Sequence, residues 1–126
     1  MSDKPLTDRL QLKPGRSIIL LNEPNEYRSL LEPLPEGSKI LTTENKADIV
    51  QVFVDSFTAL KMQLPQAFTM LNPNGILWVT YPKLTSKMRS DVNRDSIFEY
   101  GLSLSWQGVS MISVNEVWSA LRMKPK

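Results

Sequence analysis

The sequence predicts an α/β fold in which a mainly parallel sheet lies between two layers of helices. Three continuous apolar runs carry this prediction, namely SIILL at 17–21, ADIVQVFV at 47–54 and GILWVTY at 75–81. Each run is rich in β-branched or aromatic residues and is followed by polar or helix-forming sequence. Strands that are apolar throughout are typical of parallel sheets, because helices cover both of their faces. A shorter run, SKILTT at 38–43, adds a fourth predicted parallel strand.

The first predicted helix follows the strand at 17–21 and begins at Pro24. Proline suits the first helical position because its missing N–H would have no partner there. Apolar side chains at Tyr27, Leu30 and Leu31 recur at helical spacing and form one stripe. The segment PLPEG at 33–37 is expected to end this helix.

Two further helices are predicted between the later strands. The second begins at Ser56, and Pro65 inside it is expected to kink it or divide it, because proline breaks the hydrogen-bond pattern of a helix. The third is expected to begin at Ser86 or Ser90, since either serine can cap an N-terminus. Gly101 is a suitable C-terminal stop.

The end of the chain predicts an antiparallel hairpin. Two apolar or alternating runs, 102–114 and 117–123, are separated by a turn at Asn115. The predicted element order is therefore β-α-β-β-α-β-α-β-β. Trp106 and Trp118 belong to this hairpin, and they either cover the sheet or form a homodimer contact.

The composition limits the chemistry. The 126 residues fit a single domain, with residues 1–14 expected to be poorly ordered or loosely packed. The sequence has neither cysteine nor histidine, so we expect no metal, and any catalysis would depend on carboxylates, lysines, tyrosines or main-chain dipoles. The net charge of +2 is too small to indicate nucleic acid. Since no apolar run has the length of a membrane span and residues 1–15 lack a signal-peptide core, we expect a cytoplasmic protein.

The stretch LPQAFTMLNPNGILWVTYPK at 64–83 runs from a helix through a turn into a strand. It resembles the second half of a class I S-adenosylmethionine methyltransferase, a family in which a helix, a turn and the fifth strand recur in this way. In that family the sheet also ends in an antiparallel hairpin. The resemblance implies a three-layer, Rossmann-like fold, here truncated, and S-adenosylmethionine as the cofactor if the family's activity is kept.

The whole chain is also similar to a small group of uncharacterised bacterial proteins that share a domain of unknown function. This resemblance implies no particular reaction. The shared segments appear here as Lys13-Pro14-Gly15, Leu20-Leu21-Asn22, Ala47-Asp48-Ile49-Val50, Tyr81-Pro82-Lys83, Ser90-Asp91-Val92-Asn93-Arg94-Asp95 and Trp118-Ser119-Ala120-Leu121-Arg122.

The turn after the first strand, Asn22-Glu23-Pro24-Asn25, contains no glycine. A glycine-rich turn lets the main chain approach a cofactor closely, and the following helix offers it N–H groups. Pro24 removes one such N–H, while Glu23 and Glu26 add negative charge near the place of the cofactor's carboxylate. We favour the interpretation that Asn22 and Asn25 cap a helix whose dipole the glutamates complement. This turn is therefore expected to be filled.

Glu44 is a candidate for a second cofactor contact. The resemblance implies an acidic residue after the second strand that accepts hydrogen bonds from the ribose, and Glu44 follows Asn22 by 22 residues. Only residues 44–46 separate the second and third predicted strands, whereas neighbouring parallel strands usually need a crossover of about a dozen residues. One of these strands is therefore shorter than predicted, or the two are not neighbours. The link also leaves no room for the helix and strand that the family places there.

The segment 81–95 carries the densest cluster of reactive side chains. Tyr81 and Lys83 follow a central strand, and ligands bind at this end of the strands in open α/β sheets. Ser86 and Ser90 add hydroxyl groups near a helix start, whose N–H groups favour an anion.

The helix that follows offers both charges on one face. Asp91 lies three and four residues before Arg94 and Asp95. One interpretation is an anion or phosphate held by Lys83, the helix start and either Arg89 or Arg94. The other is an exposed helix with salt bridges and capping serines.

Three functions are compatible with these patterns. The preferred one is a binding or scaffold domain without methyl-transfer activity that holds a small anionic ligand near Lys83. The second is a divergent S-adenosylmethionine-dependent methyltransferase with Glu44 on the ribose and a rearranged turn at Asn22. The third is an interaction protein that forms a homo-oligomer through the terminal hairpin. The sequence assigns no catalytic residue.

Overall fold

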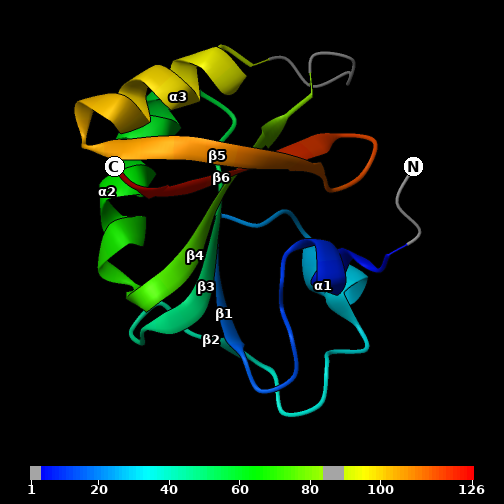
Figure 1. Ribbon diagram of the computed structural model, residues 1–126. Helices are drawn as coiled ribbons and strands as arrows, with labels where there is room; N and C mark the ends of the chain where they lie inside the picture. The colour runs from blue at the N-terminus through cyan, green and yellow to red at the C-terminus, as the bar shows by residue number, and fades with distance from the viewer. Residues whose placement is uncertain (1–3, 84–89) are drawn as a thin grey trace.

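The structure is a computed structural model, and it describes residues 4–83 and 90–126 (Figure 1). It confirms the predicted α/β class, with one six-stranded mixed sheet. The elements are α1 (Leu6–Arg9), β1 (Ser17–Leu21), the 3-10 helix η1 (Tyr27–Leu31), β2 (Lys39–Leu41), β3 (Ala47–Phe53), α2 (Phe57–Thr69), β4 (Leu71–Pro82), α3 (Arg94–Ser103), β5 (Trp106–Ser113) and β6 (Trp118–Pro125).

The strand order is β2-β1-β3-β4-β6-β5. The first four strands are parallel, and β6 and β5 continue the sheet in antiparallel pairs. The short link at 42–46 is explained by this order, because β2 has only three residues and β1 lies between β2 and β3. Both alternatives that the sequence offered for this link therefore hold.

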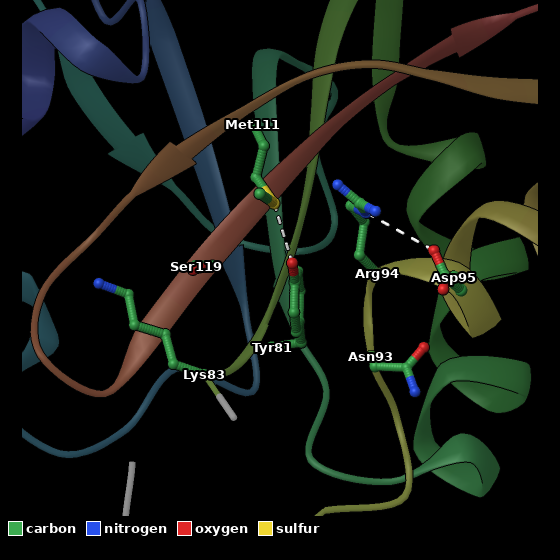
Figure 2. Close-up of a pocket in the computed structure, with 7 residues that line it drawn as sticks. All are labelled: Tyr81, Lys83, Asn93, Arg94, Asp95, Met111 and Ser119. Carbon is green, nitrogen blue, oxygen red and sulfur yellow. Dashed lines mark hydrogen bonds and ion pairs between the residues drawn. The ribbon is translucent and has the colours of Figure 1, made fainter. Parts of the chain in front are cut away.

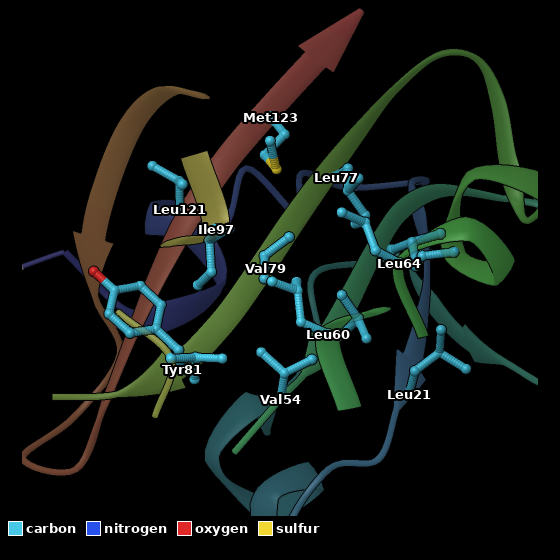
Figure 3. Packing of buried hydrophobic residues seen from close by; sticks show 14 of the residues in the cluster. Leu21, Val54, Leu60, Leu64, Leu77, Val79, Tyr81, Ile97, Leu121 and Met123 are labelled. Atoms are coloured by element: carbon cyan, nitrogen blue, oxygen red, sulfur yellow. The ribbon is translucent and has the colours of Figure 1, made fainter. Parts of the chain in front are cut away.

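Side chains alternate between the two faces of the sheet, and each face has its own core. On one face, Leu60 and Leu64 of α2 and Ile97 of α3 pack against the sheet residues Val79 and Leu121 (Figure 3). On the other face, α1 and η1 cover a second cluster of buried side chains. The result is the predicted three-layer arrangement.

The segment before β1 differs from the loosely packed one expected for residues 1–14. Its described part contributes Leu6, Leu10 and Leu12 to the core. The Leu10 carbonyl accepts a hydrogen bond from Nε1 of Trp78 at 3.0 Å. Because α1 has only four residues and a single leucine, Leu6, it gives no periodic pattern that could be recognised in the sequence.

The first predicted helix is corrected by the structure. The helix is the 3-10 helix η1, which begins at Tyr27 and not at Pro24, and no side chain caps it. Asn22 and Glu26 have φ angles of 58° and 68°, so the chain turns sharply on both sides of Pro24. Asparagine adopts this left-handed region more readily than most residues, which explains Asn22 at the end of β1. The prediction that Asn22 and Asn25 cap a helix is wrong.

The second helix begins as predicted. The Ser56 hydroxyl accepts a hydrogen bond from the main-chain N–H of Ala59 at 3.0 Å, which caps α2. Pro65 lies inside α2 without dividing it, since α2 is a single helix of 13 residues. The Pro65 side chain is exposed, so its ring does not displace core residues.

The start and end of the third helix are also corrected. Asn93, and not Ser90, caps α3, and Ser96 completes a capping box by accepting a hydrogen bond from the Asn93 main-chain N–H. Gly101 lies inside α3 and does not stop it. A Cβ atom at Gly101 would overlap the Cε of Met123, so the glycine lets α3 pack closely on β6.

The terminal hairpin is confirmed. The Asn115 side chain closes it by accepting hydrogen bonds from the main-chain N–H groups of Val117 and Trp118, at 2.8 and 2.9 Å. β5 is one of the two edge strands of the sheet, and a β-bulge interrupts its register between Gly108 and Ser110. Near its end the Ser113 carbonyl accepts a hydrogen bond from the guanidinium of Arg9.

The tryptophans belong to the packed interior or its margin. Trp78 is 1% exposed and Trp118 is 8% exposed. Trp106 is half-buried and stacks on Phe68, with ring centroids 4.2 Å apart. Trp106 and Trp118 therefore both pack against the sheet, and a homodimer contact through the hairpin stays a prediction.

Candidate ligand pocket at the end of β4

A pocket of about 410 Å³ lies where β4 ends and α3 begins (Figure 2). Two features of the fold create it. β4 runs on to Pro82 beside β6, and the asparagine cap places the first turn of α3 next to that end. The lining residues are Tyr81, Lys83, Asn93, Arg94, Asp95, Met111 and Ser119.

Tyr81 supplies a hydroxyl group to this pocket. The residue is 6% exposed, and its hydroxyl contacts the Met111 sulfur at 2.9 Å (Figure 2). Burial raises the pKa of Tyr81, and the Arg94 charge offsets this only in part. The phenol therefore stays protonated at neutral pH. Because a thioether is a weak acceptor, an anionic ligand would offer the hydroxyl a better partner.

Arg94 brings a positive charge to the same pocket. Its Nε lies 3.6 Å from Oδ1 of Asp95, and the two side chains are 62% and 82% exposed. Ion pairs this exposed contribute little to stability, typically about 0–1 kcal/mol. A ligand carboxylate or phosphate can therefore bind the Arg94 guanidinium at little cost to the fold.

Lys83 lies at the rim of the pocket. Its Nζ donates a hydrogen bond to the Ser113 hydroxyl at 2.6 Å, and its main-chain N–H donates to the Val117 carbonyl at 2.7 Å. Figure 2 shows the amine directed away from Tyr81. Lys83 thus adds positive charge to the surroundings while it is anchored to the hairpin.

Two predicted ligand-binding residues, Ser90 and Asp91, precede α3 in the chain. Their side chains contact the start of α2 and do not line this pocket. Oδ1 of Asp91 accepts a hydrogen bond from the Phe57 main-chain N–H at 2.7 Å. The Ser90 hydroxyl donates to the Asp55 carbonyl at 2.8 Å. Both side chains therefore connect the segment before α3 to the first turn of α2. Ser86 and Arg89 lie outside the described residues.

Asn22 and Glu44 occupy a different place in the fold. Asn22 follows β1 and Glu44 follows β2, so both lie beyond the carboxyl ends of two neighbouring strands. Both are exposed, and neither lines the pocket at β4. Among the predicted site residues, the structure brings together Tyr81, Lys83 and Arg94.

Four lining residues were not predicted to bind a ligand. Asn93 and Asp95 lie beside Arg94 at the start of α3, and the predicted segment 81–95 contained them. Met111 and Ser119 come from β5 and β6, and only the strand pairing brings them to the pocket. No local sequence signal could have identified those two.

Within residues 4–83 and 90–126, no three acidic side chains gather as a metal ion would require. The same ranges contain no helix with the length and hydropathy of a membrane span.

Solved structures resemble the chain across nearly all of its length. The ribosomal protein L11 methylase of Lactobacillus delbrueckii subsp. bulgaricus matches with a TM-score of 0.66 and 14% identity, over 96% of this chain and 75% of its own. An S-adenosylmethionine-dependent methyltransferase of Geobacter sulfurreducens, in complex with S-adenosylhomocysteine, matches with a TM-score of 0.64 and 9% identity, over 100% and 92%. An S-adenosylmethionine-dependent methyltransferase of Thiobacillus denitrificans, also in complex with S-adenosylhomocysteine, matches with a TM-score of 0.62 and 10% identity. The match covers 100% of this chain and 92% of that enzyme.

The chain has a class I methyltransferase fold. These identities are low enough that the likeness concerns the fold alone. No family model and no curated protein sequence matches the chain.

The turn after β1 differs from what a cofactor requires of a methyltransferase fold. Oε2 of Glu23, a residue of this turn, accepts a hydrogen bond from Nε of Arg28 at 3.0 Å, so the turn carries an anchored carboxylate. A glycine-rich turn would instead present bare main-chain N–H groups. The residues present therefore do not match a site for the carboxylate of S-adenosylmethionine.

The side chains behind that turn are also packed together. Tyr27 is 2% exposed, and its ring lies edge-on to Phe53 with centroids 4.6 Å apart. Its hydroxyl donates to Oε1 of Gln51 at 2.8 Å, and Nε2 of Gln51 donates to the Thr80 hydroxyl at 3.1 Å. This network joins η1, β3 and β4 and was missed in the sequence, where the polar Gln51 inside an apolar strand was the available signal.

Proposed function

We propose that the chain is a binding domain for a small anionic ligand, built on a methyltransferase fold and without methyl-transfer activity. The observation that carries the proposal is the pocket of about 410 Å³ in which Tyr81 and Arg94 meet. Lys83 adds a third group that favours an anion at the rim.

The side chains suggest how the anion would be held. An oxygen of the ligand accepts a hydrogen bond from the Tyr81 hydroxyl in place of the Met111 sulfur. The Arg94 guanidinium binds the same acidic group, since its fork of N–H donors matches a carboxylate or a phosphate. Asp95 remains beside Arg94 as an acceptor, and it disfavours ligands with further negative charge nearby.

The turn after β1 supports the absence of methyl transfer. Its glutamate is already paired with Arg28, and Tyr27 fills the space behind it with a hydrogen-bonded ring. Opening a pocket there would remove an aromatic side chain from the core. Such a change costs about 3–5 kcal/mol when the ring is lost altogether.

The test is a thermal-shift titration with phosphate, nucleotides and small carboxylic acids. A ligand that binds only the folded state raises Tm with concentration. We expect a saturable shift with at least one anion, and a Kd about tenfold higher in Arg94→Ala, since a hydrogen bond to a charged group is worth about 1.5–3 kcal/mol. Arg28→Ala is the matched control, because its side chain is exposed to a similar extent, 60%, and lies away from the pocket.

Two results would contradict the proposal. One is the absence of any saturable shift with the anions. The other is an equal loss of affinity in Arg94→Ala and Arg28→Ala, which would indicate a general effect of charge.

A divergent S-adenosylmethionine-dependent methyltransferase is the second candidate. It is favoured by the match of the whole chain to two methyltransferases that were solved with S-adenosylhomocysteine. Glu44 after β2 would then hold the ribose. Titration with S-adenosylmethionine and S-adenosylhomocysteine separates the candidates, since a saturable shift that Glu44→Gln abolishes would replace the first proposal with this one.

A further inference from the structure

A second hollow of about 450 Å³ adjoins the pocket at β4 and lies between α3 and the edge strand β5. Arg94, Asp95 and Met111 line both hollows, so the two lie side by side. The residues that belong to the second hollow alone are Phe98, Gly108, Val109, Ser110 and Leu121.

The second hollow is mainly apolar. Phe98, Val109 and Met111 are 38%, 43% and 46% exposed, which is high for large apolar side chains, and Leu121 below them is buried. Gly108 provides room for the ring of Phe98, because a Cβ at that position would lie 3.0 Å from Cδ2 of Phe98. The charged residues of this hollow are the two that it shares with the first pocket.

We infer that the ligand is an amphipathic acid, with a carboxylate bound at Arg94 and Tyr81 and an unbranched aliphatic chain lying over Phe98 and Val109. This inference rests on the proposed function and adds the chemical class of the ligand. The positive charge at one end and the apolar surface at the other match the two ends of such a molecule. Met111 lies at the junction, where a flexible thioether adapts to an alkyl chain.

A partner's β-strand is a less suitable occupant of the same edge. The bulge between Gly108 and Ser110 interrupts the register of β5, and a bulge makes an edge a poor template for another strand. The Ser113 carbonyl is already bonded to Arg9. A polar nucleotide would leave Phe98 and Val109 exposed, whereas an alkyl chain would cover them.

The experiment is isothermal titration of the full chain with butanoate, hexanoate and octanoate, and with octanol as the uncharged probe. We expect Kd to fall about threefold for each added methylene, because each buried CH₂ contributes a favourable transfer free energy. Octanol should bind at least tenfold more weakly than octanoate. Arg94→Ala should weaken the three acids to a similar extent.

Phe98→Ala tests the apolar hollow separately. It should weaken octanoate at least fivefold while leaving butanoate unchanged. Leu102→Ala is the matched control, since Leu102 lies one turn further along α3, is 39% exposed and lines neither hollow. Its affinity for octanoate should equal that of the wild type.

The outcomes distinguish this inference from the proposed function. Equal binding of butanoate and octanoate, or equal effects of Phe98→Ala and Leu102→Ala, would show that the second hollow does not bind an aliphatic chain. The proposed anion pocket would be unaffected. Equal binding of octanol and octanoate would contradict the proposal that Arg94 binds the carboxylate of the ligand. If none of the acids binds and no other anion does, both proposals are wrong.

Discussion

The hydroxyl of Tyr27 donates a hydrogen bond to the side-chain oxygen of Gln51, 2.8 Å away, between two residues that are 2% and 0% exposed. Gln51 passes the interaction on to Thr80. Burial raises the pKa of Tyr27 far above its ordinary value, so the hydroxyl remains a donor. Buried polar groups contribute favourably to stability only when they are paired. Here the paired groups join η1, β3 and β4.

Tyr27→Phe tests this network. The substitution leaves the Gln51 oxygen buried without its donor, so the free energy of unfolding should fall by about 1–3 kcal/mol. Urea denaturation monitored by tryptophan fluorescence measures the change. Tyr100→Phe is the control, because the Tyr100 hydroxyl lies 3.5 Å from its acceptor on an exposed site. Equal stabilities of the two variants would show that the network contributes nothing specific.

Asn93→Ala tests the cap of α3. It removes the acceptor of the Ser96 main-chain N–H, which is 2.9 Å from Oδ1 of Asn93, and should cost about 0.5–2 kcal/mol. Asn25→Ala should change stability by less than about 0.5 kcal/mol, because no side chain caps η1. Thermal or urea unfolding of the two variants decides this. A larger effect at Asn25 than at Asn93 would contradict the uncapped start of η1.

Asp48 is expected to make the free energy of unfolding depend on pH in the acidic range. The main-chain N–H of Ser17, 2.9 Å from Oδ2, and the Asn72 amide lower the pKa of Asp48 in the folded protein. A carboxyl group with a lowered folded pKa stabilises the protein above its unfolded pKa of about 3.9. This contribution is lost as the pH falls through the folded value.

Asp48→Asn should therefore be less stable than the wild type at neutral pH and lose less stability on acidification. The measurement is the free energy of unfolding from about pH 7 down to about pH 2, in urea at constant ionic strength. Parallel curves for the two proteins would exclude Asp48 as a source of the pH dependence.

Tyr81→Phe separates ligand binding from stability. In the absence of ligand the Tyr81 hydroxyl contacts a thioether, so its removal should cost less than about 1 kcal/mol. The affinity for an anion should fall about fivefold, which corresponds to one hydrogen bond of about 1 kcal/mol. Titration of the variant with the best anion measures this, and an unchanged Kd would remove Tyr81 from the binding site.

The sequence was sufficient to predict the sheet and its terminal hairpin, because continuous apolar strands and the turn at Asn115 are local signals. The first helix was predicted wrongly for a physical reason. Of the predicted apolar stripe, Tyr27 and Leu31 are buried but Leu30 is 49% exposed, because a 3-10 helix after two left-handed residues has a tighter period than the predicted helix. Strand β4 also begins earlier than predicted, at Leu71, because a register shift lets it pair with Ala47 through a segment that contains Pro73.

The candidate pocket could be predicted only in part. Tyr81, Lys83 and Arg94 follow each other along the chain, so a strand end and the next helix identify them. Met111 comes from another strand, and its place depends on the sheet order. Ser90 and Asp91 have the chemistry of a binding site, but their main-chain hydrogen bonds at α2 show that local composition does not reveal which partner a side chain meets.

The contact of Arg9 with the Ser113 carbonyl has a consequence for the behaviour of the protein in concentrated solution. Together with the bulge at Val109, it shields the open edge of β5 from strands of other molecules. Shortening the chain to begin at Ser17 would uncover that edge and the apolar face beneath α1. We expect the shortened protein to aggregate, with turbidity and thioflavin T fluorescence rising on incubation. Residues 4–16 would thus protect the folded protein from forming fibrils.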